Sequence, residues 1–331
     1  VGKEYHNHVT GVDGFLRLNR SKDIRFQLLG SQTDYPDNIA IEFGQQQQSF
    51  NGIALYAKFT HAGRYFNYGV LYEDLGTNFR ADYGFMPRVD TRRINGYIEP
   101  VFWGKGGWFE KISFKIQGEN INDHNNLLTD RDLIFSLAYQ GPLQSYVNLV
   151  SKIRKEYYEG VVYDLAKYQV SFWMTPVGAF NFVFTGRYGD AIDYENCRKA
   201  DALLLWPSIE WRIGGHLNVS LNHTYEKLTI RNEKIYIANL FEARLGYHFN
   251  RRTFLRGIVQ YTDISRNTGL YIMPVEARSK YLFTQFLFSY KINPQTVLFL
   301  GYSDNLFGNN EMAPIRANRT FFLKIGYALT L

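Results

Sequence analysis

The chain contains a single cysteine, no run of about 18 apolar residues, and neither a heptad nor a Gly-X-Y repeat. One cysteine cannot form a disulfide within the chain, which excludes a disulfide scaffold. The lack of a long apolar run excludes a helical membrane protein. The missing repeats exclude a coiled coil and a collagen.

The charge balance is mildly basic, with 37 Lys and Arg against 31 Asp and Glu, a net charge of +6 and a pI near 9.1. The basic residues are scattered, no run of five occurs, and neither a glycine-rich phosphate loop nor a zinc-ligand spacing is present. We therefore expect no nucleic-acid partner, no metal and no cofactor.

Aromatic residues are abundant, at 17% of the chain, and they alternate with small or polar residues. In 321–331 the odd positions from Phe321 to Leu331 are all apolar or aromatic, whereas Lys324, Gly326 and Thr330 lie between them. Because residues two apart in a strand share a face, this pattern predicts a two-sided β-strand. The same alternation recurs in 111–117, 180–188, 205–213, 216–226 and 240–249.

The connections alternate between short and long. Tight turns are expected at 61–64, 105–107, 141–142, 175–178, 214–215, 250–252 and 293–295, with longer polar loops at 34–49, 76–92, 119–130, 154–163, 189–202, 229–235, 265–279 and 306–317. This regularity is typical of an antiparallel up-and-down β-barrel. We count about sixteen strands (16–18) from residue 23 onward, and 12–19 is a further candidate. If 12–19 is a strand the count becomes odd, so either it does not span or the chain continues a longer barrel. We expect one domain over 1–331.

A barrel of this size is too wide for side chains to fill, so its interior holds water or a plug. The polar face must then point inward and the apolar face outward into lipid, which predicts an all-β transmembrane barrel of a Gram-negative outer membrane. The expected partners are outer-membrane lipid and lipopolysaccharide, with other outer-membrane or periplasmic subunits as a further candidate. A β-sandwich or a propeller with an aromatic core is the alternative.

The predicted lumen face carries most of the informative chemistry. Its charged residues are Lys111, Lys115, Arg187, Glu210, Arg212, Glu226, Glu242, Arg244, Arg256, Lys291 and Lys324. The basic excess predicts a weak anion preference, because rings of charge bias which ions pass. Alternatively, the near neighbours Glu210/Arg212 and Glu242/Arg244 neutralise each other and brace the wall.

No catalytic set is evident. His124 lies beside Asp123 and close to Asp130 and Asp132, but no Gly-x-Ser-x-Gly motif accompanies it. The oxygen-rich loops 119–132 and 304–311 lack the spacing of a calcium motif, and Cys197 lacks the partners of a haem attachment site. We therefore expect no enzymatic activity, with a hydrolase at the loop rim as the weakest alternative.

Three segments resemble a known family. They are Gly11-Val12-Asp13-Gly14, the stretch from Phe79 to Asp90 followed by Arg92-Arg93, and Phe321 to Tyr327. Together they resemble the C-terminal barrel region of the bacterial family catalogued as domain of unknown function 5916. The motif residues that carry it are Phe79, Asp82, Gly84, Phe85, Pro87, Arg88 and Asp90.

The resemblance implies an outer-membrane barrel. It covers most of this chain but only the later part of a family member, since members often carry an N-terminal sugar-binding sandwich of the family 9 type. Some are labelled membrane-associated hydrolases. Two functions follow as hypotheses: a pore or conduit for a solute or a partner segment, and a non-conducting barrel that anchors a larger assembly.

Overall fold

The computed structural model describes residues 5–293, 295–309 and 315–328. Within these residues the chain forms seventeen β-strands in one antiparallel sheet. Their bounds are β1 (His6–Asn19), β2 (Lys22–Asp34), β3 (Phe50–Ala62), β4 (Phe66–Leu75), β5 (Thr91–Trp103), β6 (Lys111–Asn122), β7 (Leu128–Gly141), β8 (Ser145–Tyr158), β9 (Val161–Val177), β10 (Phe180–Asp193), β11 (Arg198–Ile213), β12 (Leu217–Ile230), β13 (Glu233–His248), β14 (Thr253–Arg266), β15 (Arg278–Asn293), β16 (Thr296–Gly308) and β17 (Ile315–Tyr327).

Helical structure in the described residues is limited to short pieces. These are the single α-helix α1 (Asp37–Glu42) and the 3-10 turns η1 (Tyr194–Asn196) and η2 (Thr268–Leu270). None of them is long and apolar enough to cross a membrane.

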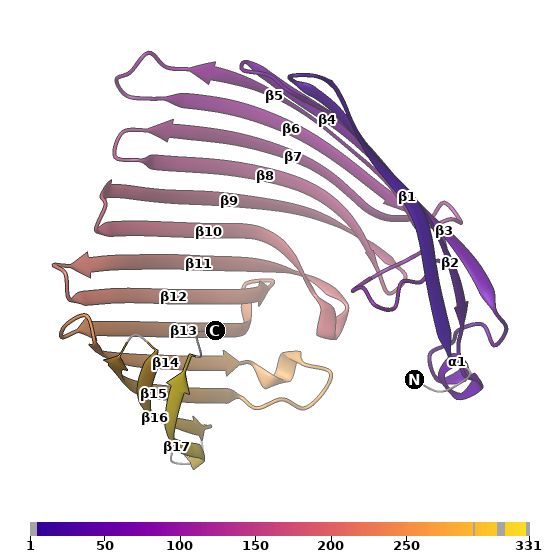
Figure 1. Cartoon of the computed structure of the whole chain (residues 1–331). Helices are drawn as coiled ribbons and strands as arrows, with labels where there is room; N and C mark the ends of the chain where they lie inside the picture. Colours follow the sequence, from indigo (N-terminus) through magenta and orange to yellow (C-terminus); the bar gives the residue numbers. More distant parts are fainter. Residues whose placement is uncertain (1–4, 294, 310–314, 329–331) are drawn as a thin grey trace. The chain divides into compact units, whose positions relative to one another are not determined.

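Contacts divide the chain into two compact units. Unit 1 comprises Val1–Gly104, Lys111–Leu137 and Ser151–Ala166, and unit 2 comprises Lys105–Glu110, Ala138–Val150 and Lys167–Leu331. In unit 1 the strands β1 to β6 pair in chain order, and in unit 2 the strands β9 to β17 do the same. Figure 1 shows β10 to β14 lying side by side in this order. The predicted fold class, an all-β antiparallel up-and-down β-barrel, is confirmed in its strand architecture, and seventeen described strands lie within the expected 16–18.

The strand registers separate an apolar face from a polar face. In unit 2 the apolar side chains Leu245, Phe286 and Ile325 are exposed by 50%, 49% and 64%. Residues on the opposite face are mainly polar or charged, and the buried apolar clusters are small. Large apolar side chains exposed over a whole face are not expected in a water-soluble sheet, which would bury them.

The strands are longer than the sequence predicted, and several loops are correspondingly shorter. The expected loop 154–163 is the two-residue turn Glu159–Gly160, and the expected loop 229–235 is the turn Arg231–Asn232. All four residues have positive φ, which is the geometry of tight hairpin turns. The polar residues around these turns belong to paired strand ends.

The first strand also differs from expectation. It spans His6–Asn19 and pairs with β2 along nearly its whole length. The candidate strand 12–19 is therefore confirmed as part of a longer strand, and whether it spans the membrane stays a prediction.

Candidate functional site

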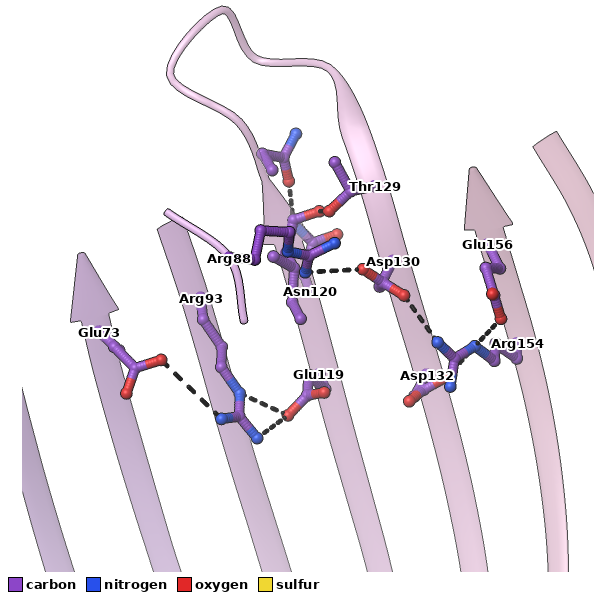
Figure 2. Close-up of polar contacts among 12 residues, drawn as sticks. Glu73, Arg88, Arg93, Glu119, Asn120, Thr129, Asp130, Asp132, Arg154 and Glu156 are labelled. Carbon is purple, nitrogen blue, oxygen red and sulfur yellow. Dashed lines mark hydrogen bonds and ion pairs between the residues drawn. The ribbon is translucent and has the colours of Figure 1, made fainter. Parts of the chain in front are cut away.

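In each unit, the strand ends joined by the longer connections are called the loop end, and the opposite ends the turn end. In unit 1 the polar face near the loop end carries a ladder of ion pairs (Figure 2). On β5, Arg93 lies between Glu73 of β4 and Glu119 of β6. Its Nη2 is 2.6 Å from Glu119 Oε2, and its Nη1 is 4.0 Å from Glu73 Oε1. The Asn95 amide also donates to Glu119, at 2.9 Å. The arginine is therefore oriented from both sides.

A second group of ion pairs joins β7 and β8. Asp130 accepts hydrogen bonds from Arg88 at 3.0 Å and from Arg154 at 2.7 Å. Arg154 also pairs with Glu156 at 2.8 Å, while Lys152 is 2.7 Å from Asp132. The side chains of Asp130 and Asp132 are only 11% and 8% exposed. Because a buried carboxylate is unfavourable without a partner, these contacts together stabilise the local fold.

The loop 76–90 lies across this region and is fixed at its start by packing. Phe79 is only 2% exposed, and its backbone lies against Gly52 of β3. A Cβ at Gly52 would come within 2.3 Å of the Phe79 backbone, so only glycine fits. The backbone N–H of Arg80 donates to the Ser31 hydroxyl, and the Arg80 guanidinium donates to Gln45. The loop therefore joins the wall and the segment after α1.

The middle of the loop is fixed by Asp82. Its carboxylate accepts hydrogen bonds from the hydroxyls of Tyr5, at 2.6 Å, and Tyr35, at 3.0 Å. Burial and the neighbouring Asp82 carboxylate raise the pKa of Tyr35 to about 12, so this phenol stays protonated and continues to donate. Directly beyond, Tyr83 and Phe85 are 101% and 94% exposed. The loop thus presents two aromatic rings to solvent from an anchored backbone.

His124 ties the loop 76–90 to the connection between β6 and β7. Its Nδ1 lies 2.7 Å from Asp90 and its Nε2 lies 2.9 Å from Asp74. The sequence neighbour Asp123 does not hold this histidine but accepts the backbone N–H of Leu127. Both ring nitrogens face carboxylates, so neither is directed at a nucleophile in the described part of the chain.

The carboxylate of Asp90 is held in its ionised form. Burial opposes ionisation, but hydrogen bonds from the His124 backbone, from Thr77 and from the His124 ring outweigh it and keep the pKa of Asp90 below its ordinary value. Of the family-like motif, Phe79, Asp82, Arg88 and Asp90 therefore anchor the loop. Gly84 closes a turn onto the Ala81 carbonyl, and Phe85 and Pro87 are exposed.

In unit 2 the register places the predicted charged residues on one face. Three rows of cross-strand partners carry most of them. One row contains Arg187 and Glu226. Of the two rows nearer the turn end, one contains Glu210 and Arg244 and the other contains Arg212 and Arg256. Glu242 and Lys291 share that face, as does Lys324. In unit 1 Lys111 and Lys115 share the face of Glu119 and lie over the rings of Trp103 and Tyr97, at 5.6 and 4.5 Å. That this face lines a lumen stays a prediction.

The two charge pairs expected to brace the wall behave differently. Arg244 pairs with Glu242 at 3.0 Å. Arg212 instead donates to the carbonyl of Gly178 in the neighbouring turn. Of the two pairs, only Glu242 and Arg244 therefore form an ion pair with each other.

The loop end of unit 2 holds a cavity of about 760 Å³. The loop that contains η2 folds against the wall, where Arg198 donates to the Leu270 carbonyl and Asn196 accepts the Ile272 N–H. Glu195, Glu226 and Glu276 line the cavity together with Tyr271. Burial raises the pKa of Tyr271. The carboxylates of Asp193, Glu195, Glu226 and Glu276 outnumber the single Arg266 in this lining, so the cavity is acidic, in contrast to the arginines at the turn end.

Within the described ranges, no group of three or more His, Cys, Asp or Glu side chains is placed to hold a metal ion. Cys197 is exposed after η1 in a left-handed conformation.

The contacts that fix the loop 76–90 and its neighbour are not predicted from the sequence. Arg88–Asp130 and His124–Asp74 join residues that lie 42 and 50 positions apart.

Comparisons with known proteins return structures only. No family model matches the chain, and no curated protein matches it. The in-vitro folded outer membrane protein OmpT of Vibrio cholerae, in its trimer form, is 12% identical over 96% of this chain and 99% of its own, with a TM-score of 0.37. The outer membrane channel DcaP of Acinetobacter baumannii is 10% identical over 97% of each chain, with a TM-score of 0.30.

Proposed function

We propose that this chain forms a β-barrel in the outer membrane of a Gram-negative bacterium and serves as a pore or conduit. The observation that carries the proposal is that the same strands have one apolar face and one polar, charged face. On β13, Leu245 and Tyr247 are exposed on the apolar face, while Glu242 and Arg244 lie on the other. An exposed apolar face of this kind suits lipid, and the lipid and lipopolysaccharide of that membrane are its expected partners.

The polar face suits an aqueous interior. A closed sheet of sixteen or more strands is too wide to be filled by its own side chains and encloses water. Charged side chains such as Arg187, Arg212 and Lys324 are then hydrated, and their positive charge favours the passage of anions. The solute is accordingly expected to be small and anionic.

A second candidate function is the anchoring of a partner subunit. The observation that favours it is the loop 76–90, which holds Tyr83 and Phe85 in solvent although its backbone is tied to the wall. Exposed aromatic residues on a rigid support are common anchors in protein interfaces. We also propose that the chain belongs with the barrel region of the domain of unknown function 5916 family, because the segment 79–90 that supplies these anchors carries the motif residues of that resemblance.

Conductance in a planar lipid bilayer tests the pore. The full chain, refolded in detergent and inserted at low protein concentration, is expected to give stepwise current increases in KCl. A folded chain, recognised by its heat-dependent mobility in SDS gels, that inserts without any current steps would refute the pore. Subunits that copurify from outer membranes and are lost on Tyr83→Ser/Phe85→Ser would then favour the anchor.

A further inference from the structure

We propose that the turn end of unit 2 contains a binding site for a small organic anion, centred over Gly246 of β13. A cavity of about 440 Å³ opens there on the polar face. Its lining includes Arg212, Arg244, Arg256 and His248. The site deepens the proposed pore function, because it names the class of solute that the polar face takes up.

The register explains why a cavity forms at this place. Arg212 of β11, Asn218 of β12, Gly246 of β13 and Arg256 of β14 follow one another in a single cross-strand row. The two arginines are therefore about 14 Å apart across the sheet, at about 4.8 Å per strand. The small residues between them leave the floor open, since a Cβ at Gly246 would meet nothing closer than Asn218 Cβ at 3.9 Å.

Basic groups surround this open floor on four sides. Arg212 and Arg256 lie across the strands, and Arg244 and His248 lie two residues before and after Gly246 on β13 itself. The His248 ring stacks on Phe254, with ring centroids 5.4 Å apart. Guanidinium groups bind carboxylate and phosphate through paired N–H donors, and the aromatic pair offers an apolar wall. The arrangement fits an anion with an apolar body.

The charge of the site is only partly neutralised from within. Arg244 is paired with Glu242, whereas Arg212 and Arg256 make no ion pair in the described part of the chain. Arg256 donates from Nη2 to Gln285 at 3.2 Å, but its Nε is buried without any hydrogen-bond partner among the described residues. A buried unpaired donor is unfavourable, so the described residues leave part of the donor capacity of Arg256 unused. Glu210 is the one carboxylate among the lining residues described.

Calorimetric titration of the detergent-solubilised full chain tests the site. Phenyl phosphate and benzoate are the charged ligands, and benzamide is the neutral isostere of benzoate. We expect both anions to bind at least tenfold more tightly than benzamide. Equal binding of benzoate and benzamide would refute anion recognition, and so would the absence of binding by either anion.

Four variants locate the binding. Gly246→Leu fills the floor without changing charge, and Arg256→Gln removes the unpaired donor; each is expected to weaken phenyl phosphate binding about tenfold or more. Glu210→Gln is expected to strengthen it, because it removes a like charge from the wall. Arg187→Gln is the matched control, because Arg187 lies on the same face but outside the cavity. This variant removes the same charge as Arg256→Gln and is expected to change binding less than twofold. Unchanged binding in both Gly246→Leu and Arg256→Gln would overturn the site.

The two proposals fail separately. A chain that conducts but binds neither anion keeps the pore and refutes the site. A chain that binds phenyl phosphate with the expected variant pattern but never conducts keeps the site and refutes the pore. Heat-dependent gel mobility of every variant confirms that it is folded before its binding is measured.

Discussion

The guanidinium of Arg88 lies 3.0 Å from the carboxylate of Asp130 and joins the loop 76–90 to strand β7 (Figure 2). Asp130 is almost buried, and Arg154 holds it from the other side at 2.7 Å. The end of the loop is therefore fixed to a carboxylate that is itself part of the wall. Four further contacts, through Phe79, Arg80, Asp82 and Asp90, fix the rest of the loop.

The first prediction concerns this tether. Arg88→Gln removes the ion pair while Arg154 still neutralises Asp130, so the barrel should fold and only the loop should open more often. Because Arg88 is 48% exposed, the loss is about 0.5–1 kcal/mol. Chymotrypsin should then cut at Tyr83 or Phe85 about two- to fivefold faster. Arg20→Gln, in the exposed turn after β1, is the matched control, and equal cleavage in both variants would contradict the tether.

The second prediction concerns Gly52, which supports Phe79. Gly52→Ala places a Cβ within 2.3 Å of the Phe79 backbone, so the strand or the loop must shift. Overpacking of this kind costs about 1–3 kcal/mol. Gly30→Ala, on neighbouring β2, adds the same methyl group where nothing lies within 4 Å and should change stability by less than about 0.5 kcal/mol. Urea midpoints followed by gel mobility compare the two, and similar midpoints would exclude the clash.

The third prediction is a loss of loop order in acid. The pKa of Asp90 in the folded chain lies below the ordinary value of 3.8, so its stabilising contribution is complete above pH 3.8 and is lost as the pH falls through the folded pKa. Pepsin cleavage of the loop, corrected for the rate on an unfolded substrate, should therefore rise steeply below pH 3.8. Asp90→Asn should be cleaved faster at pH 4.5 and show a much weaker rise.

The control for this experiment is Asp37→Asn, an exposed carboxylate on α1. It should keep the acid-dependent rise of the parent chain. A parent and an Asp90→Asn chain with superimposable pH profiles would mean that Asp90 does not hold the loop.

Sequence alternation predicted the strands well because it is a local property. In β13 the alternation of Phe241, Ala243 and Leu245 with Glu242 and Arg244 follows from the two faces of any extended chain. The polar stretch around Glu159–Gly160 is predicted as a loop from its composition, and the structure shows strands up to a two-residue turn. Its charged residues lie in strand ends, where ion pairs such as Lys155–Asp164 form across the hairpin. Composition alone does not separate a hydrated strand end from a loop.

The loop anchors could not be predicted for a different reason. His124 meets Asp74 and Asp90 only because β4, β5 and β6 pair in one particular register and the loop 76–90 turns back across their ends. The nearest acids in the sequence were therefore the wrong partners. The cavity over Gly246 likewise depends on which residues of four strands share a row, and a shift of one residue would exchange the faces.

The last prediction tests whether the polar face lines the conducting path. Arg187→Glu reverses one charge on that face, where Arg187 donates to Gln169 of β9. Lys227→Glu makes the same change on β12, where its cross-strand partners Leu203 and Ile237 place it on the apolar face near the loop end. Under a KCl gradient, the reversal potential of Arg187→Glu should shift toward cation preference, since fixed charge in a channel biases the permeating ions. Lys227→Glu should leave it unchanged. Equal shifts in both variants would mean that ions respond to the overall charge of the chain rather than to the face on which the charge lies.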